Sequence, residues 1–230
     1  MKIIVFDMDD TLYDEYTYVR SGFLEVASFL SDQLSEEQEV LFTWMWNRLH
    51  TTGRGTIFDD VLKEFNNYSA LLVKNCVTIY RQHIPNIFLP QETINCLEQL
   101  KNFTLYLVTD GDKVVQHNKA QVLDLYDRME HCYITHCYGI ENAKPSPYCF
   151  LDLLKKESVE SDDVVYIGDN PIKDFVGIKP FGFQTIRIMT GQHKDIEMPI
   201  EYEADHRISL LNELPSKLEE IWPEVKGMFL

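Results

Sequence analysis

The amino-acid sequence predicts an α/β protein with a doubly wound, mainly parallel sheet and an all-helical insertion. Short apolar segments at residues 2–6, 103–108 and 164–167 predict strands, and each runs into an aspartate within two residues. Segments with helical periodicity separate them, as in βαβ units, so we expect a parallel sheet with helices on both faces. The carboxyl ends of parallel strands share one edge of the sheet, where ligands bind in such folds.

The strands can be followed in order along the chain. Residues 2–6 form an apolar run that stops at Asp7, which is typical of a buried strand ending in a loop. Residues 131–137 are β-prone, and residues 183–188 form another apolar burst. Residues 204–208 are expected to form a short edge strand. A final helix is then expected, lined by Leu210, Leu211, Leu214 and Leu218.

Apolar residues at helical spacing mark two of the helices that lie between predicted strands. The first is marked by Val114, Val115, Val122, Leu123 and Leu125. The second is marked by Phe150, Leu151, Leu153 and Leu154. Helices at these places supply the connections that parallel strands need.

Residues 14–89 have a different character, with no convincing strand and several helical repeats. One helical face is formed by Val19, Phe23, Val26, Ala27 and Leu30. A capping box beginning at Ser35 is expected to open the next helix. We therefore expect an α/β core made of residues 1–13 and 90–230, interrupted by a helical cap domain at residues 14–89.

The composition argues against several classes of function. The 230-residue chain has a formal charge of −16, and a surface this acidic repels nucleic acid backbones and anionic membranes. No apolar run approaches the ~20 residues needed to cross a bilayer, and the N-terminus turns acidic too soon for a signal peptide. The five cysteines include no Cys-x-x-Cys pair, which suits a reducing cytosol. We expect a cytoplasmic protein without nucleic acid or membrane partners, of unknown oligomeric state.

A pair of carboxylates follows the first strand. Asp7 and Asp9 are two residues apart, so in an extended or loop segment their side chains point the same way and can address one site. Two adjacent carboxylates repel, which raises a pKa or demands a cation, and a hard ion such as Mg²⁺ takes oxygen ligands. One carboxylate can then act as a nucleophile while the other exchanges a proton with the leaving group.

Polar residues also follow the later strands. The segment Thr109-Asp110-Gly111 supplies a hydroxyl and backbone amides suited to a phosphate cradle. Lys144 can balance the charge of carboxylates and phosphoryl oxygens. Asp169 can complete a metal shell, with Asp174 either ligating the ion or supporting it indirectly. Each signal is weak alone, and their order and their positions at strand ends make the set specific.

Taken in this order, the residues resemble the four sequence motifs of the haloacid dehalogenase superfamily, in its phosphatase branch with a helical cap. The segment Asp7-Met8-Asp9-Asp10-Thr11 resembles the first motif, and Thr109-Asp110-Gly111 resembles the second. Lys144-Pro145 resembles the third motif, and Gly168-Asp169-Asn170 with Asp174 resembles the fourth. The resemblance spans essentially the whole chain, cap included.

The resemblance implies hydrolysis of a small phosphomonoester, such as a sugar phosphate or a nucleoside monophosphate. Asp7 would attack phosphorus and become an aspartyl phosphate. Asp9 would protonate the leaving oxygen and then activate water against the intermediate. The segment Thr109-Asp110-Gly111 would bind the phosphate, and Lys144 would neutralise charge.

The same resemblance implies a Mg²⁺ cofactor held by Asp7, the Asp9 backbone carbonyl and Asp169, with Asp174 close by. The cap would open to admit a small phosphorylated metabolite and close to exclude water. Arg54 lies between two glycines of the cap, so its cationic side chain is a candidate for contact with the substrate.

Two positions depart from the commonest family pattern. Asp10 stands where many relatives have glycine, and it is interpreted as a turn residue. Asp110 stands where many have asparagine. Asp110 and Asp112 place negative charge near a phosphate site, which is unfavourable unless these side chains point away or meet a cation.

Other functions stay open on the same scaffold. A haloacid dehalogenase would use Asp7 against carbon and would need neither Asp9 nor Mg²⁺. A sugar phosphomutase would use the same residues but retain a bisphosphate intermediate. A non-catalytic binding protein is a third possibility, although all four motifs are intact. The sequence does not name the substrate, because the cap residues that choose it follow no readable pattern.

Overall fold

The structure is a computed structural model in which residues 1–229 are described, and these residues form two compact units. The first unit comprises residues 1–15 and the chain from Phe88 onward, and the second comprises Tyr16–Ile87. None of the described helices is long and apolar enough to span a membrane.

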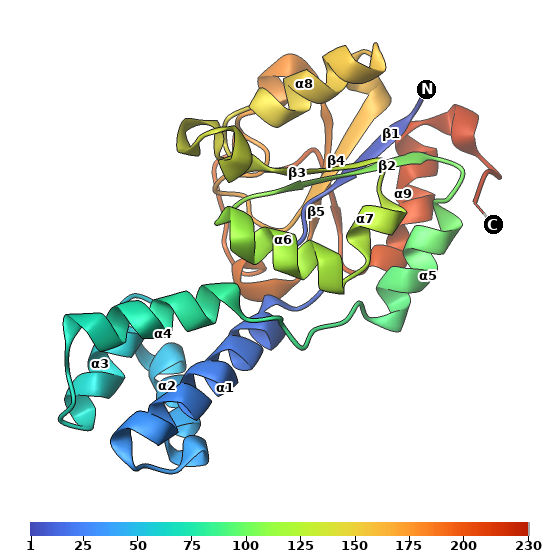
Figure 1. The fold of residues 1–230 in the computed structure, drawn as a ribbon. Helices are drawn as coiled ribbons and strands as arrows, with labels where there is room; N and C mark the ends of the chain where they lie inside the picture. Colours follow the sequence, from blue (N-terminus) through green and yellow to red (C-terminus); the bar gives the residue numbers. More distant parts are fainter. Residues whose placement is uncertain (230) are drawn as a thin grey trace. The chain divides into compact units, whose positions relative to one another are not determined.

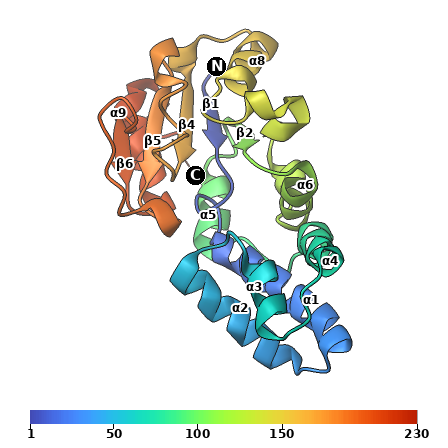
Figure 2. The ribbon, with the colours of Figure 1, turned by 90° about the vertical axis from the view of Figure 1, so that its left-hand side faces the viewer.

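The first unit is built on one sheet of six strands in the order β3-β2-β1-β4-β5-β6 (Figures 1 and 2). All five strand pairs are parallel, which confirms the predicted fold class. The strands are β1 (Ile3–Phe6), β2 (Thr104–Thr109), β3 (His131–Ile134), β4 (Val164–Gly168), β5 (Gln184–Ile188) and β6 (His206–Ile208).

Strand β1 lies at the centre of the sheet and is buried along its whole length. Phe6 at its end pairs with Leu107 of β2 on one side and with Ile167 of β4 on the other. The chain runs outward from β1 through β2 and β3, then returns to add β4 on the opposite side. The edge beyond β1 and β4 is therefore the switch point at which such sheets bind ligands.

Helices cover both faces of this sheet, with α8 on one face and α5, α6 and α9 on the other (Figure 1). The α-helices of the unit are α5 (Gln91–Gln99), α6 (Lys113–Val122), α7 (Leu125–Arg128), α8 (Tyr148–Glu157) and α9 (Leu214–Ile221). Short 3-10 helices are η1 (Thr135–Tyr138), η2 (Ile140–Asn142), η3 (Ser161–Asp163), η4 (Lys179–Phe181), η5 (Gly191–His193), η6 (Leu211–Glu213) and η7 (Pro223–Val225).

Alternate residues of the central strands divide the core between the two faces, because side chains alternate along a strand. Ile3 and Val5 pack with Phe150 and Leu153 of α8 in one buried cluster. Burying a side chain of this size contributes roughly 1.5–3 kcal/mol relative to exposure. The strand ends, where the polar residues lie, are thus held by a rigid apolar framework.

Several local expectations were wrong. Leu210, predicted to line the final helix, precedes α9 and is 47% exposed. Val114, an apolar marker of the predicted helix, is 40% exposed, whereas Gln116 and Lys119 on the same helix are 2% exposed. The helix predicted to open with a capping box at Ser35 begins instead at Gln38, without a side-chain cap. Gln116 and Lys119 are buried because their side chains contact Asp9, which follows β1.

The regular elements of the second unit are all helices: α1 (Glu15–Leu34), α2 (Gln38–Thr52), α3 (Ile57–Glu64) and α4 (Ala70–Gln82), with the first turn of α1 starting in the first unit. The five residues predicted to form one face of α1 are all buried: Val19, Phe23, Val26, Ala27 and Leu30. Ser69 caps α4, because its side chain accepts a hydrogen bond from the backbone N–H of Leu72.

Candidate active site

Asp7 lies immediately after β1 and is almost fully buried. Its Oδ1 atom accepts a hydrogen bond from Lys144 Nζ at 2.7 Å. The same ammonium group donates to Asp174 Oδ1 and to the hydroxyl of Tyr166, both at 2.8 Å. Lys144 thus joins residues that follow or lie within the two central strands, β1 and β4.

Asp174 is held from two sides. Its Oδ1 atom accepts from Lys144 and from the Tyr166 hydroxyl, and its Oδ2 atom accepts from the backbone N–H of Asn170 at 2.9 Å. Gly168 is necessary for this packing, because a Cβ atom there would lie 2.6 Å from Asp174 Oδ2. Each oxygen of Asp174 accepts from a protein donor, and Oδ2, with a single donor, keeps a lone pair that an ion could use.

The charges of this cluster are unbalanced. Burial raises the pKa of Asp7 to about 8; Lys144 opposes that rise, while Asp174 and Asp169 add to it. Burial would lower the pKa of Lys144, but Asp174 and Asp7 hold it well above its usual value. Asp7 and Asp174 share one ammonium group, and Asp169 adds a third buried carboxylate nearby, so an additional cation would relieve their mutual repulsion.

The donor set fits a hard divalent cation. Carboxylate oxygens of Asp7, Asp169 and Asp174 all lie within 4.8 Å of one another. In the described part of the chain, Asp7 Oδ2 and Asp169 Oδ1 accept no hydrogen bond, so each can offer a lone pair to an ion. Oxygen ligands of this kind are those that Mg²⁺ prefers.

Asp9 is held by donors from three other residues. Its Oδ1 atom accepts from Lys119 Nζ at 2.8 Å and from the Tyr13 hydroxyl at 2.7 Å. Its Oδ2 atom accepts from Gln116 Nε2 at 2.9 Å. Burial would raise the pKa of Asp9, but Lys119 and these hydrogen bonds hold it below the usual value. Asp9 is therefore an anion with a fixed orientation.

Gln116 also contacts Thr109, the hydroxyl predicted to bind phosphate. The Gln116 amide nitrogen donates to Thr109 Oγ1 at 2.6 Å while its second hydrogen serves Asp9. Because Thr109 Oγ1 is the acceptor in this bond, its own O–H stays available to donate to a phosphoryl oxygen. One amide therefore orients both side chains, and α6 is the element that carries it.

Asp110 meets a cation, one of the two arrangements in which its charge is acceptable near a phosphate site. Its Oδ2 atom lies 3.1 Å from Lys173 Nζ. Its Oδ1 atom accepts from the Thr135 hydroxyl at 2.6 Å and from the backbone N–H of Lys144 at 3.1 Å. Burial opposes the effect, but Lys173 and Thr135 hold the pKa of Asp110 below its usual value. The carboxylate thus anchors the loop that carries Lys144.

The neighbouring residues of this loop have structural explanations. Gly111 has a φ of +143°, in the region that favours glycine. Asp112 is the N-cap of α6 and accepts from the backbone N–H groups of Val114 and Val115. The negative charge of Asp112, which would be unfavourable beside a phosphate, instead caps the N-terminus of α6.

Arg54 belongs to the second unit, in the exposed segment between α2 and α3. The Asp7, Asp9, Thr109, Lys144, Asp169 and Asp174 side chains all belong to the first unit. The contact of Arg54 with a substrate stays a prediction, as do the catalytic and metal-binding roles of the other residues.

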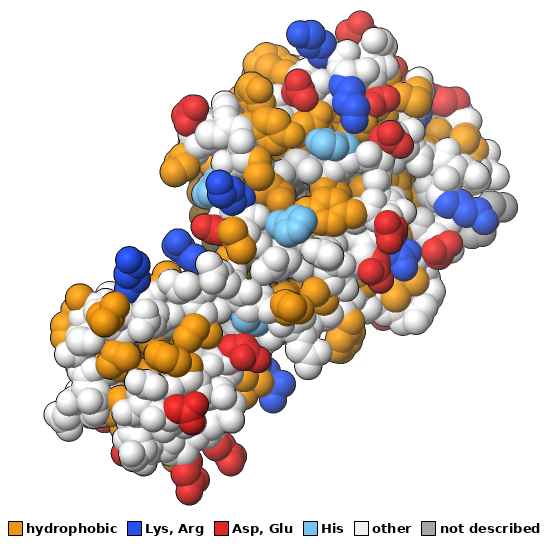
Figure 3. Space-filling model, viewed as in Figure 1, with side chains coloured by type: hydrophobic (Ala, Val, Ile, Leu, Met, Phe, Trp, Pro, Cys, Tyr) orange, Lys and Arg blue, Asp and Glu red, His pale blue; other side chains and the backbone are white. Residues whose placement is uncertain are grey.

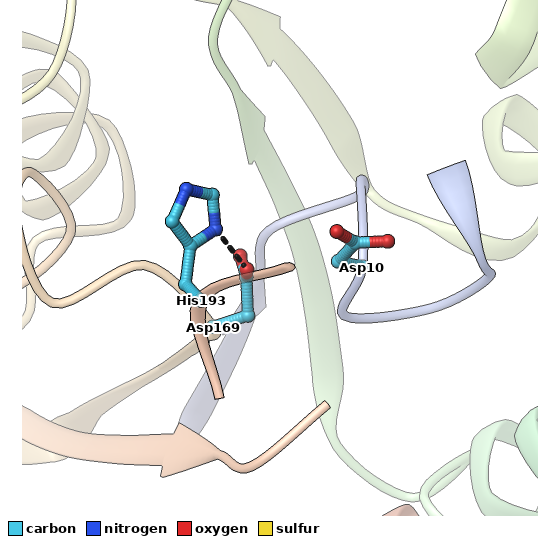
Figure 4. Close-up of side chains that lie close together, drawn as sticks. All are labelled: Asp10, Asp169 and His193. Carbon is cyan, nitrogen blue, oxygen red and sulfur yellow. Dashed lines mark hydrogen bonds and ion pairs between the residues drawn. The ribbon is translucent and has the colours of Figure 1, made fainter. Parts of the chain in front are cut away.

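A second group of side chains joins Asp169 to the loop after β5 (Figure 4). Ligand atoms of Asp10, Asp169 and His193 lie within 4.8 Å of one another. His193 Nδ1 is 2.8 Å from Asp169 Oδ2. Burial raises the pKa of Asp169, which the hydrogen bond from His193 partly offsets.

Asp10 serves as the turn residue that the sequence analysis favoured. Its φ is +56°, a left-handed conformation that aspartate tolerates better than most residues. Its Oδ1 atom accepts from the backbone N–H of Glu15 at 2.9 Å.

Sequence reasoning missed Gln116, Lys119 and His193. A usable signal existed for the first two: together with Ala120 and Leu123 they occupy positions i, i+3, i+4 and i+7 of one helical face. A polar pair within such a stripe, directly after a strand-end motif, indicates side chains aimed at the site. His193 carried no such signal, because the 3-10 helix η5 in which it lies is too short to show a periodic pattern.

Comparison with known proteins places this site in a family. Residues 1–182 match the family model described as a haloacid dehalogenase-like hydrolase. A curated glyceraldehyde 3-phosphate phosphatase from Methanocaldococcus jannaschii is 29% identical over 221 residues, which cover 93% of this chain and 95% of that protein. The human N-acylneuraminate-9-phosphatase is 22% identical over 240 residues, covering 96% and 95% of the two chains.

Solved structures with the same fold include a 2-haloacid dehalogenase from Pseudomonas syringae. It aligns with a TM-score of 0.65 and 22% identity, covering 96% of this chain and 99% of the other. This similarity supports the parallel, doubly wound α/β fold that the strand order indicates.

Proposed function

The chain belongs to the haloacid dehalogenase-like hydrolase family and is a phosphatase of that family, and we propose that it hydrolyses small phosphomonoesters with Asp7 as nucleophile and Mg²⁺ as cofactor. The observation that carries the proposal is the hydrogen bond from Lys144 Nζ to Asp7 Oδ1, which holds the buried carboxylate in one orientation. A carboxylate held in this way is suited to in-line attack through one oxygen, while its other oxygen, Oδ2, is open to the ion.

In the proposed reaction, Asp7 attacks phosphorus and an aspartyl phosphate forms as the ester oxygen leaves. Asp9 gives that oxygen a proton and later takes one from the water that hydrolyses the intermediate. Asp9 is ionised in the substrate-free arrangement. The negative charge of a bound phosphate would raise the pKa of Asp9 and so favour its protonation.

The phosphate itself is proposed to lie against Thr109 and the backbone of Gly111, with Lys144 neutralising part of its charge. Asp110 is proposed to act through its backbone and through its hold on the Lys144 loop, because its carboxylate is bonded to Thr135 and Lys173. Asp7 and Asp169 would hold Mg²⁺, together with the Asp9 backbone carbonyl, while Asp174 supports Lys144. When bound, the ion would withdraw charge from the phosphoryl oxygens and favour attack.

Residues Tyr16–Ile87 are proposed to act as a cap that selects the substrate and excludes water during phosphorylation. Arg54, at an exposed position of this unit, is the proposed contact for a second anionic or polar group of the substrate.

The substrate class proposed is a small phosphorylated carbohydrate. Similar proteins are named for glyceraldehyde 3-phosphate and for N-acylneuraminate 9-phosphate, both of which are phosphate esters of small polyhydroxy compounds. Nucleoside monophosphates are the second class to test. On the face drawn in Figure 3, the lysine and arginine side chains are dispersed among acidic and apolar ones.

A phosphate-release screen with Mg²⁺ tests the proposal. It would compare glyceraldehyde 3-phosphate, larger sugar phosphates and nucleoside monophosphates, using wild-type protein and Asp7→Asn prepared identically. We expect phosphate release from at least one triose or sugar phosphate, none with Asp7→Asn, and none after removal of divalent metal with EDTA. Isomerised product without free phosphate would indicate a phosphomutase instead.

A further inference from the structure

We propose that His193 is a positioning residue for the divalent cation, because it fixes the carboxylate of Asp169. This inference rests on the proposed metal site at Asp7 and Asp169. His193 lies outside the four family motifs, in the loop that follows β5 (Figure 4).

The partners of the two ring nitrogens of His193 define its tautomer and its ring orientation. Nδ1 lies 2.8 Å from Asp169 Oδ2, and Nε2 lies 3.2 Å from the Asn170 amide nitrogen. Since the carboxylate can only accept and the amide nitrogen can only donate, Nδ1 carries a proton and Nε2 accepts. This ring donates to Asp169 Oδ2 and leaves Asp169 Oδ1 free to meet an ion.

The loop that carries His193 is fastened to the first motif through Asp10. The Thr190 hydroxyl donates to the backbone carbonyl of Asp10 at 2.6 Å, and the backbone N–H of Gln192 donates to Asp10 Oδ2 at 3.1 Å. Gly191 allows this approach, because a Cβ atom there would lie 2.3 Å from Asp10 Cβ and its φ is +64°. These contacts hold residues 190–192, just before His193, against Asp10 in the segment after β1.

A buried arginine fixes the same loop from the other side. Arg187 of β5 is fully buried, and its Nη2 atom donates to the backbone carbonyls of His193 at 2.6 Å and Ile196 at 2.9 Å. Its Nη1 atom is bonded to Glu203 Oε1 at 2.7 Å. A guanidinium with these partners holds the backbone on which the imidazole stands.

The physical consequence is a pre-oriented ligand. A carboxylate that rotates freely loses side-chain entropy when it binds an ion, whereas Asp169 is already held in one orientation. Hydrogen-bond partners of metal ligands commonly change metal affinity by about 10- to 100-fold when removed. The hydrogen bond from His193 is the contact of Asp169 that a single substitution removes most cleanly.

Isothermal titration of the full-length protein with MgCl₂, without substrate, tests this role. His193→Ala removes the imidazole, and His193→Asn restores an N–H donor near the Nδ1 position. His117→Ala is the matched control, because His117 is exposed and its Nδ1 atom lies 2.8 Å from the Tyr126 hydroxyl. Circular dichroism of each variant checks the fold.

We expect His193→Ala to weaken Mg²⁺ binding by about 10- to 100-fold, with His193→Asn and His117→Ala within a few-fold of wild type. An affinity within twofold of wild type for His193→Ala would overturn the proposal, as would equal losses in the Ala and Asn variants.

A second measurement separates positioning from direct ligation. With Mn²⁺ as the probe, electron spin echo spectra detect a nitrogen bound to the ion; a strong coupling that is lost in His193→Ala would overturn the positioning role. Mg²⁺ affinity that responds as expected, in a protein that releases no phosphate from any ester, would leave this inference standing and refute the proposed function.

Discussion

Lys119 Nζ lies 2.8 Å from Asp9 Oδ1, and the lysine side chain is 2% exposed. A buried ammonium on α6 is thus committed to a carboxylate that follows β1, 110 residues earlier in the chain. Together with Gln116 it fixes Asp9 in one orientation. This relationship ties the proposed acid–base residue to a helix that none of the sequence motifs includes.

Replacement of Lys119 by methionine is expected to lower kcat by about 10- to 100-fold, part of the ~10²–10⁴-fold that a placed acid–base group contributes. Lys119→Arg should recover part of the loss, and Lys113→Met, which removes an exposed lysine of the same helix, should be silent. Steady-state kinetics of the double variant complete a double-mutant cycle. In the Asp9→Asn background, Lys119→Met should have little further effect on kcat. If the losses in kcat from the two substitutions add, Lys119 does not act through Asp9.

Replacement of Gln116 by leucine is expected to lower kcat/KM by about 30-fold, because two hydrogen bonds worth ~1 kcal/mol each in net terms are lost. The Thr109 hydroxyl and the Asp9 carboxylate would both lose their orientation. Gln121→Leu, at an exposed position of α6, is the control. Equal kinetics for the two leucine variants would contradict the role assigned to Gln116.

Replacement of Lys144 by methionine is expected to lower the free energy of unfolding by about 3 kcal/mol at pH 8 without metal, because buried carboxylates would lose their cation. Urea denaturation measures this, and added Mg²⁺ should restore part of the stability. Lys173→Met removes a more exposed pair, with Asp110, and should cost no more than about 1 kcal/mol. Similar losses for both variants would argue against the buried charge cluster.

Mg²⁺ affinity is expected to fall as pH is lowered below about 8, the value to which burial raises the pKa of Asp7. The cation and the proton compete for the same carboxylate, so apparent affinity should drop by up to about tenfold per pH unit there and level off above it. The sign is fixed by the raised pKa: the metal-free fold favours protonated Asp7 and loses stability as pH rises toward 8. Titration calorimetry in two buffers measures the released proton, and a flat profile from pH 6 to 9 would contradict this.

Much of the fold and part of the site geometry could be predicted from the sequence, because both depend on strand ends. The apolar runs that end at Asp7, Thr109 and Asp169 are strands whose carboxyl ends share one edge, so their closeness follows from parallel topology. Asp112 could have been read as a helix cap by its position before α6.

The remaining contacts could not be predicted, for physical reasons. A lysine or glutamine on a helix is usually solvated, so the burial of Lys119 and Gln116 depends on partners that are remote in sequence. His193 depends on a loop shaped by Gly191 and Arg187, and no periodicity describes such a loop. The partners of Asp110 are Thr135, in η1, and Lys173, which follows β4. Only the folded chain brings them together.

The central claim is that Asp7 becomes phosphorylated during turnover. Rapid acid quench of the wild-type protein with a hydrolysed substrate and Mg²⁺, followed by peptide mass spectrometry, measures this directly, with Asp9→Asn used to slow breakdown of the intermediate. The account predicts a phosphoryl group on the peptide containing Asp7, located at that residue and absent from Asp7→Asn. A phosphoryl group on another residue, or full phosphate release by Asp7→Asn, would contradict it.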